Sequence, residues 1–226
     1  MGKNVLIVAA HPDDEILGCG GTAARLANEG NAVFTLILGE GITARDDSRD
    51  RVQREAEITT LKNSIHLANH AIGVRDVFIY DFPDNRFDSV PLLDIVKIVE
   101  KIKTKLKPQI ILTHYGHDLN IDHRITYRAV LTASRPLFGE RVNEIYAFEV
   151  LSSTEWNYPT RFSPNYFVDI SQTLDRKIDA MSEYRQELRE YPHPRSLKGI
   201  RLNAEYWGMR TGRSAVEAFE VVRSVQ

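Results

Sequence analysis

Short apolar, β-branched runs alternate with segments of helical periodicity along the first two thirds of the chain. The apolar runs predict strands over residues 4–10, 32–38, 77–80, 109–113 and 145–150. The helical spacing predicts helices over residues 12–28, 48–68, 91–106 and 122–134. Strands that alternate with helices favour right-handed βαβ units, so we expect an α/β fold with a mostly parallel sheet flanked by helices.

The pattern changes after Leu151. Residues 152–164 are rich in aromatic side chains and proline, which indicates a loop, and we expect a short strand over 166–170 and a helix over 173–191. The rest is predicted to be a mixed C-terminal extension, interrupted by Pro192, Pro194, Gly199, Gly208 and Gly212. A chain of 226 residues can bury one core. We therefore predict a single domain over 1–226, with its core over about 4–150 and a substrate-side region over about 151–226.

Composition excludes several classes of protein. The net charge of −2 provides neither the basic surface that binds nucleic acid nor a polybasic membrane anchor. No apolar run approaches the roughly 18–20 residues that span a bilayer, and the N-terminus lacks the parts of a signal peptide. Cys19 is the one cysteine, so an internal disulfide is impossible. We expect a cytoplasmic enzyme without a transmembrane segment or a nucleic-acid partner.

Two polar clusters follow predicted inner strands. Residues 10–15 (Ala-His-Pro-Asp-Asp-Glu) end the first strand, and residues 113–124 follow the fourth. Ligands of open parallel sheets bind at the carboxyl ends of the strands, where these clusters would meet. Imidazole and carboxylate suit zinc, whose catalytic sites use about three protein ligands. A proline followed by acids is also a common helix start, but the presence of two such clusters favours a metal site.

The same clusters resemble the motifs of a known family. His11-Pro12-Asp13-Asp14-Glu15, with glycines at 18, 20 and 21, looks like the signature of the PIG-L/LmbE-like deacetylases, and Asp122-His123-Arg124 matches that family's second motif. Weaker matches are Arg54 with Glu57, and Asp84. The resemblance covers roughly residues 4–190. It implies a Rossmann-like three-layer fold, hydrolysis of N-acetylglucosamine-type amides, and a homo-oligomer.

Carried over to this sequence, the resemblance implies that His11, Asp14 and His123 bind Zn²⁺ and that Asp13 is the general base. Zinc lowers the pKa of water toward about 7 and polarises the acetyl carbonyl. A carboxylate outside the metal's coordination can then take the proton and deliver it to the departing amine. The expected reaction releases acetate and a free amine from an N-acetylated sugar.

One position departs from the family pattern. The family often has a histidine three residues before the metal-binding one, where it helps to stabilise the tetrahedral intermediate, and this chain has Asn120. Asparagine can donate a hydrogen bond to an oxyanion, but it is also a preferred N-cap, and both roles stay open. His117 or His114 could assist catalysis instead, or either could be structural.

Four residues are candidates for substrate binding. Arg54 and Asp84 could contact sugar hydroxyls, although a solvated helix face and a turn after proline are the alternatives. His193 and Arg195 lie in a Pro-bracketed segment that could border the site, or form a rigid surface turn.

The glycines after Asp14 lack a phosphate-loop pattern, so we expect them to allow tight packing. Other functions to test are hydrolysis of a phosphoester or a non-sugar amide, and sugar or nucleotide binding without turnover.

Overall fold

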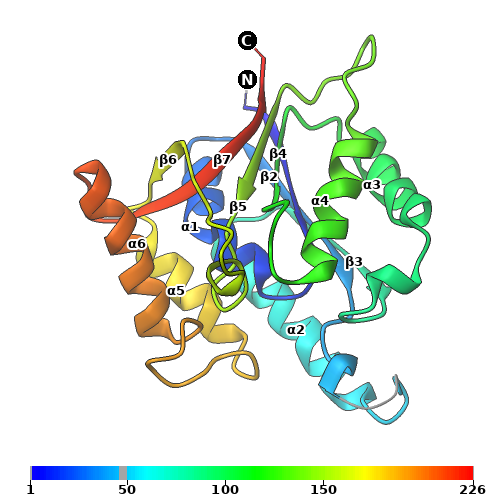
Figure 1. The fold of residues 1–226 in the computed structure, drawn as a ribbon, viewed down its shortest axis with the longest axis horizontal. Coiled ribbons are helices and arrows are strands. Elements are labelled where there is room, and N and C mark those ends of the chain that lie inside the picture. Colours follow the sequence, from blue (N-terminus) through cyan, green and yellow to red (C-terminus); the bar gives the residue numbers. More distant parts are fainter. Residues whose placement is uncertain (1, 46–49, 226) are drawn as a thin grey trace.

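The computed structural model describes residues 2–45 and 50–225, which form one seven-stranded sheet in the order β3-β2-β1-β4-β5-β7-β6 (Figure 1). The strands β1 to β5 are parallel, while β7 runs antiparallel to β5 and to β6. The strands are β1 Asn4–Ala9, β2 Ala32–Gly39, β3 Asp76–Phe82, β4 Ile110–His114, β5 Glu144–Phe148, β6 Tyr166–Asp169 and β7 Val216–Ser224. The predicted α/β class and the mostly parallel sheet are confirmed.

Helices cover both faces of the sheet. One face carries α1 Asp14–Asn28, α2 Glu55–Ala71, α5 Leu174–Glu183 and α6 Leu197–Thr211, and the other carries α3 Leu92–Leu106 and α4 Ile121–Ala133 (Figure 1). Short 3₁₀ helices are η1 Thr43–Arg45, η2 Phe87–Ser89 and η3 Thr154–Trp156. This is the predicted three-layer arrangement. The expected start of the second helix, at Ser48, lies outside the described residues.

The central strand β1 is apolar along its whole length because it is buried on both sides. Val5 and Ile7 pack into the core under α1, whereas Leu6 and Val8 pack into the core under α3 and α4. A strand between two helical layers has no solvent face, so it has no polar alternation. The polar residues begin where this strand ends, and this places them at the carboxyl edge of the sheet.

The glycines of α1 bring this helix close to the sheet. A Cβ at Gly18 would lie 2.2 Å from the Phe148 ring, and one at Gly21 would lie 2.7 Å from Ile170. The expectation that these glycines serve close packing is confirmed. The helix is interrupted at Cys19, whose φ is −149°.

A buried ion pair from the C-terminal region supports this interruption. The Glu217 carboxylate accepts hydrogen bonds from the amides of Gly21 (3.0 Å) and Thr22 (2.7 Å). Lys177 donates to Glu217 at 2.6 Å and to the carbonyl oxygen of Leu17 at 2.8 Å. The amides and the carbonyl that the interruption would otherwise leave unpaired are thereby satisfied.

The C-terminal region differs from its prediction. The helix expected to reach Tyr191 ends at Glu183, because the next residue, Tyr184, is buried and directs its hydroxyl to Glu15. The stretch predicted to be mixed instead forms α6 and β7. Gly199 and Gly208 do not break α6: each lies where a neighbouring backbone approaches. A Cβ at Gly199 would lie 2.5 Å from the carbonyl oxygen of Pro194, and one at Gly208 would lie 2.6 Å from that of Arg213. This contact explains the glycines.

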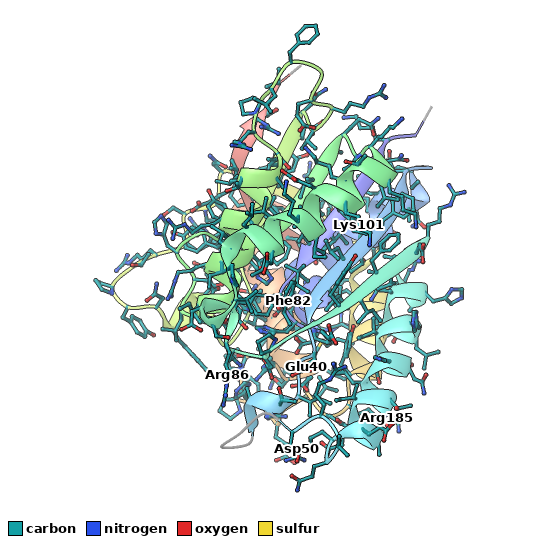
Figure 2. All side chains as sticks on the ribbon, turned by 90° about the vertical axis from the view of Figure 1, so that its right-hand side faces the viewer. Glu40, Asp50, Phe82, Arg86, Lys101 and Arg185 are labelled. Atoms are coloured by element: carbon teal, nitrogen blue, oxygen red, sulfur yellow. The ribbon has the colours of Figure 1, made fainter. Side chains whose placement is uncertain are left out.

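The carboxyl ends of β1 to β4 lie at one edge of the sheet. Glu40 and Phe82, labelled in Figure 2, follow β2 and end β3 there, and the amide of Glu40 donates to the carbonyl oxygen of Phe82 at 3.1 Å. The loops that leave this edge carry both polar clusters of the sequence.

Candidate metal centre and its cavity

Two imidazoles and a carboxylate converge at the carboxyl edge. His11 and Asp14 lie on the turn between β1 and α1, and His123 lies in the first turn of α4. One donor atom of each lies within 4.8 Å of the others. The Oδ2 atom of Asp14 is 3.4 Å from His11 Nδ1 and 3.3 Å from His123 Nε2. The three residues that sequence comparison selected as metal ligands are therefore close together in space.

Each of these imidazoles has a carboxylate at its other nitrogen. His11 Nε2 lies 2.9 Å from Asp122 Oδ2, and His123 Nδ1 lies 3.1 Å from Asp118 Oδ1. Such carboxylates fix the tautomer and the ring orientation of metal-binding histidines. The remaining nitrogens, Nδ1 of His11 and Nε2 of His123, both face Asp14. This donor set fits a divalent metal of the zinc type.

Asp118 is itself held firmly. It is fully buried and accepts hydrogen bonds from the hydroxyls of Ser153 and Thr154. Burial alone would raise the pKa of Asp118, but the contact with the His123 imidazole and the hydrogen bonds from Ser153 and Thr154 lower it to about 2. The carboxylate therefore stays charged beside His123 at neutral pH. The sequence analysis missed this residue, although an acid within the second polar cluster was a usable signal.

Asp13 is the N-cap of α1 and has a left-handed backbone, with φ of 95°. Its amide donates to Glu15 Oε2 at 3.1 Å, and Glu15 is held in turn by Asn69 (2.9 Å) and the Tyr184 hydroxyl. These contacts hold the turn through the backbone amide of Asp13, and its side chain makes no capping hydrogen bond to α1. Burial raises the pKa of the Asp13 carboxyl well above its usual range, and the charges of Asp14 and Glu187 add to this effect.

A cavity of about 350 Å³ lies above these residues. The three converging residues and Asp13 line it from the sheet edge. Two later segments complete the lining: residues 150–153, which follow β5, and the stretch between α5 and α6, which contributes Glu187, Arg189 and Arg195. A volume of this size is within the range of small-molecule sites.

Asp84 and Asn120 also line the cavity. Asp84 Oδ1 is 3.4 Å from His11 Nε2, and Asp84 Oδ2 accepts from the amide of Ala44 at 3.2 Å. Asn120 caps α4: its Oδ1 accepts from the amides of Asp122 (2.8 Å) and His123 (3.4 Å). The capping interpretation of Asn120 is confirmed. Its Nδ2 donates to Asn85 at 2.7 Å.

The two other candidate histidines of the second cluster lie away from the cavity. His117 is exposed and contacts Tyr115 edge-on, because the loop turns Asp118 inward at the next position. The structure does not bring His117 to the cavity lining. His114 is buried in β4, where its Nε2 accepts from the amide of Ala10 at 2.8 Å and its ring stacks on His123. This contact makes His114 structural.

Some of the predicted substrate-binding residues line the cavity, and others lie outside it. Arg195 lines the cavity and lies 3.4 Å from Asp13 Oδ2. His193 packs against Trp156 outside the cavity lining, and Arg54 pairs with Glu57 at 2.6 Å, also outside it. Neither His193 nor Arg54 is brought to the cavity. Glu187, which does line it, had no distinguishing signal in the sequence.

A mostly parallel α/β sheet with imidazole and carboxylate donors at its carboxyl edge defines a protein with a candidate metal centre. The sequence pattern of the PIG-L family, described as GlcNAc-PI de-N-acetylase, matches residues 6–134. This span is more than half of the chain, and the chain belongs to that family. Among residues 2–45 and 50–225, no helix combines the length and the apolar character needed to cross a bilayer.

Similar proteins include sugar deacetylases. The chain is 27% identical to the diacetylchitobiose deacetylase of Thermococcus kodakarensis, over 99% of this chain and 84% of the relative. The structure of N,N'-diacetylchitobiose deacetylase from Pyrococcus horikoshii aligns with a TM-score of 0.78 and 20% identity, over 98% of this chain and 84% of that one. The 4-carboxy-2-hydroxymuconate hydratase of Pseudomonas putida aligns with a TM-score of 0.76 and 20% identity, over 99% and 98%. Structural likeness at this identity therefore establishes the fold, and the reaction must be argued from the site.

Proposed function

We propose that this protein is a zinc-dependent deacetylase that hydrolyses the N-acetyl group of an N-acetylglucosamine-type sugar or sugar conjugate. The observation that carries the proposal is the convergence of His11, Asp14 and His123 within 4.8 Å, with the Asp13 carboxylate at the same cavity. Family membership and the diacetylchitobiose deacetylase relative support the substrate class.

His11, Asp14 and His123 would hold the metal, which supplies Lewis acidity toward the acetyl carbonyl and makes water more acidic. Asp122 and Asp118 keep the two imidazoles oriented. Asp13 takes a proton from the attacking water, and the water oxygen forms a bond to the acetyl carbon. Asp13 then returns a proton to the amide nitrogen as the C–N bond breaks, which leaves acetate and an amine.

Asp13 performs both proton transfers in this scheme. Asn120 has no proton to give, and its Oδ1 is committed to the amides of Asp122 and His123. The raised pKa of Asp13, caused mainly by burial, suits a group that must accept a proton and later release it. We assign contacts with sugar hydroxyls to Asp84 and Asn85, and their position in the cavity lining supports this assignment.

The test is metal analysis of the purified protein, followed by assays of amine release from N-acetylglucosamine and N,N'-diacetylchitobiose. We expect bound zinc and release of equal amounts of amine and acetate. Asp13→Asn should keep the metal and lower kcat by about 10²–10⁴-fold. Phosphate release from a phosphoester, or sugar binding without any product, would identify one of the other functions instead.

Four finer points belong to the same proposal. Zinc as the resident metal rests on the imidazole and carboxylate donors. Assembly into a homo-oligomer and a cytoplasmic location remain predictions from the sequence, as does the treatment of residues 1–226 as one domain.

A further inference from the structure

The segment between α5 and α6 brings a guanidinium group to Asp13. Arg195 Nη1 lies 3.4 Å from Asp13 Oδ2, although 182 positions separate the two residues in the chain. Within residues 2–45 and 50–225, no other side chain donates a hydrogen bond to the Asp13 carboxylate. The pairing joins the first polar cluster of the sequence to its C-terminal region.

The backbone around Arg195 is well fixed. The Arg195 amide donates to His193 Nδ1 at 3.1 Å, and its carbonyl oxygen accepts from the amide of Arg189 at 3.4 Å. The next residue, Ser196, caps α6 by accepting from the amide of Gly199 at 2.9 Å. The direction of the Arg195 side chain toward the cavity is therefore set by α6 and by the turn before it.

A second carboxylate lies near the same guanidinium nitrogen. Glu187 Oε2 is 3.7 Å from Arg195 Nη1, and both residues line the cavity. The Arg195 Nε atom is buried and makes no hydrogen bond to the described residues. Asp13 and Glu187 thus both lie near Nη1, offset the charge of the guanidinium and leave it poorly suited to capture an anionic part of a substrate.

Asp13 needs such a partner. Its side chain is about 5% exposed, and Asp14 and Glu15 follow it directly in the chain. A carboxylate that is buried among other acids is costly unless a cation or hydrogen-bond donor compensates it. Because Arg195 engages Oδ2, the Oδ1 atom remains available to receive the proton of a water molecule in the cavity.

We propose that Arg195 is a positioning residue, which holds the Asp13 carboxylate in the orientation that the deacetylation step requires. This inference rests on the proposed function, because it assigns Asp13 the proton transfers. It replaces the expectation that Arg195 binds the substrate directly. Arg195 acts through Asp13, so its effect should disappear when Asp13 is already disabled.

The first experiment compares Arg195→Gln and Arg195→Lys with the wild-type enzyme on an N-acetyl sugar that the wild type hydrolyses. Misplacing a reacting group by about 1 Å costs about 10²-fold, so we expect kcat to fall by about 10–100-fold in Arg195→Gln, with KM and metal content nearly unchanged. Arg195→Lys should recover part of the loss. A raised KM with an unchanged kcat would overturn the proposal, because it would mean direct substrate binding.

A matched control is Arg201→Gln, which removes an arginine that pairs with Asp175 at 2.6 Å far from the cavity lining. It should leave kcat unchanged. The double variant Asp13→Asn with Arg195→Gln should be no slower than Asp13→Asn alone. Losses that multiply would show that Arg195 acts independently of Asp13, and would overturn the proposal.

A measurement without turnover separates this inference from the proposed function. Urea unfolding of the two single variants and the double variant forms a mutant cycle, and the pairing predicts midpoint shifts that do not add. Additive shifts would overturn the Arg195–Asp13 pairing even in an active enzyme. Conversely, a wild-type protein that releases no amine would remove the proposed function, while the cycle would still decide whether the two residues interact.

Discussion

The cavity has two walls that are built in different ways. The strand-end wall consists of residues 10–15 and 113–124, which leave β1 and β4 at the carboxyl edge of the sheet. The C-terminal wall consists of residues 150–153 and 187–195. Adjacent parallel strands place the first set automatically, and residues 150–153 follow the parallel strand β5 in the same way. Residues 187–195, in contrast, are positioned by the packing of α5 against α1 and α2 and of α6 against α5.

The two walls also differ in how firmly their polar groups are held. Asp122 Oδ2 lies 2.9 Å from His11 Nε2, and Asp118 Oδ1 lies 3.1 Å from His123 Nδ1. Arg195 contributes a 3.4 Å contact to Asp13 from a partly exposed side chain. In the proposed function, the strand-end wall provides the metal ligands, and Arg195 on the C-terminal wall adjusts the reactive carboxylate.

The largest expected effect lies on the strand-end wall. His123→Ala removes one of the three converging donors and leaves Asp118 without its imidazole partner. We expect loss of bound metal together with loss of amine release, measured by elemental analysis and by a fluorescent amine assay. His117→Ala, which changes an exposed histidine of the same loop, is the control and should retain both. Full metal content in His123→Ala would contradict the assigned donor set.

The next effect tests how much of the fold depends on the C-terminal region. Glu217→Ala leaves Lys177 buried without its partner and the amides of Gly21 and Thr22 unpaired. Breaking a buried pair in this way should lower the free energy of unfolding by about 3–5 kcal/mol, measured by urea denaturation.

The control for this variant is Asp175→Ala, which breaks the exposed pair with Arg201. That change should cost no more than about 1 kcal/mol. Equal losses of unfolding free energy in Glu217→Ala and Asp175→Ala would mean that the Glu217–Lys177 pair does not stabilise the interrupted α1. The C-terminal region would then contribute less to the stability of α1 than its contacts indicate.

The smallest expected effect concerns Asp118, the carboxylate that contacts the Nδ1 atom of His123. Asp118→Asn keeps the size of the side chain but removes the charge that faces His123 Nδ1. Metal affinity should fall by about 10–100-fold, measured by competition with a chromogenic chelator. Asp88→Asn, at an exposed position in η2, should leave affinity unchanged. An unaltered affinity in Asp118→Asn would show that the two hydroxyl donors and the loop alone keep His123 oriented.

Much of the sheet was predictable because its strands are buried on both sides. The apolar runs at β1, β2 and β4 are typical of strands buried on both faces. Their predicted bounds differ from the observed ones by only a few residues. The C-terminal region was harder to predict. The glycines at 199 and 208 look like helix breakers, and only the approach of other backbone segments reveals why α6 contains them.

Hydrophobic periodicity was enough to predict the parallel α/β core, because that signal is local. The placement of two polar clusters at strand ends predicted where a site would lie, and the family resemblance selected His11, Asp14 and His123 within them. The packing of the folded chain was needed to show that Arg195 meets Asp13, that Asn120 is used as a helix cap, and that His117 is exposed. Those outcomes depend on how distant segments pack, and a contact across 182 positions leaves no periodic signal in the chain.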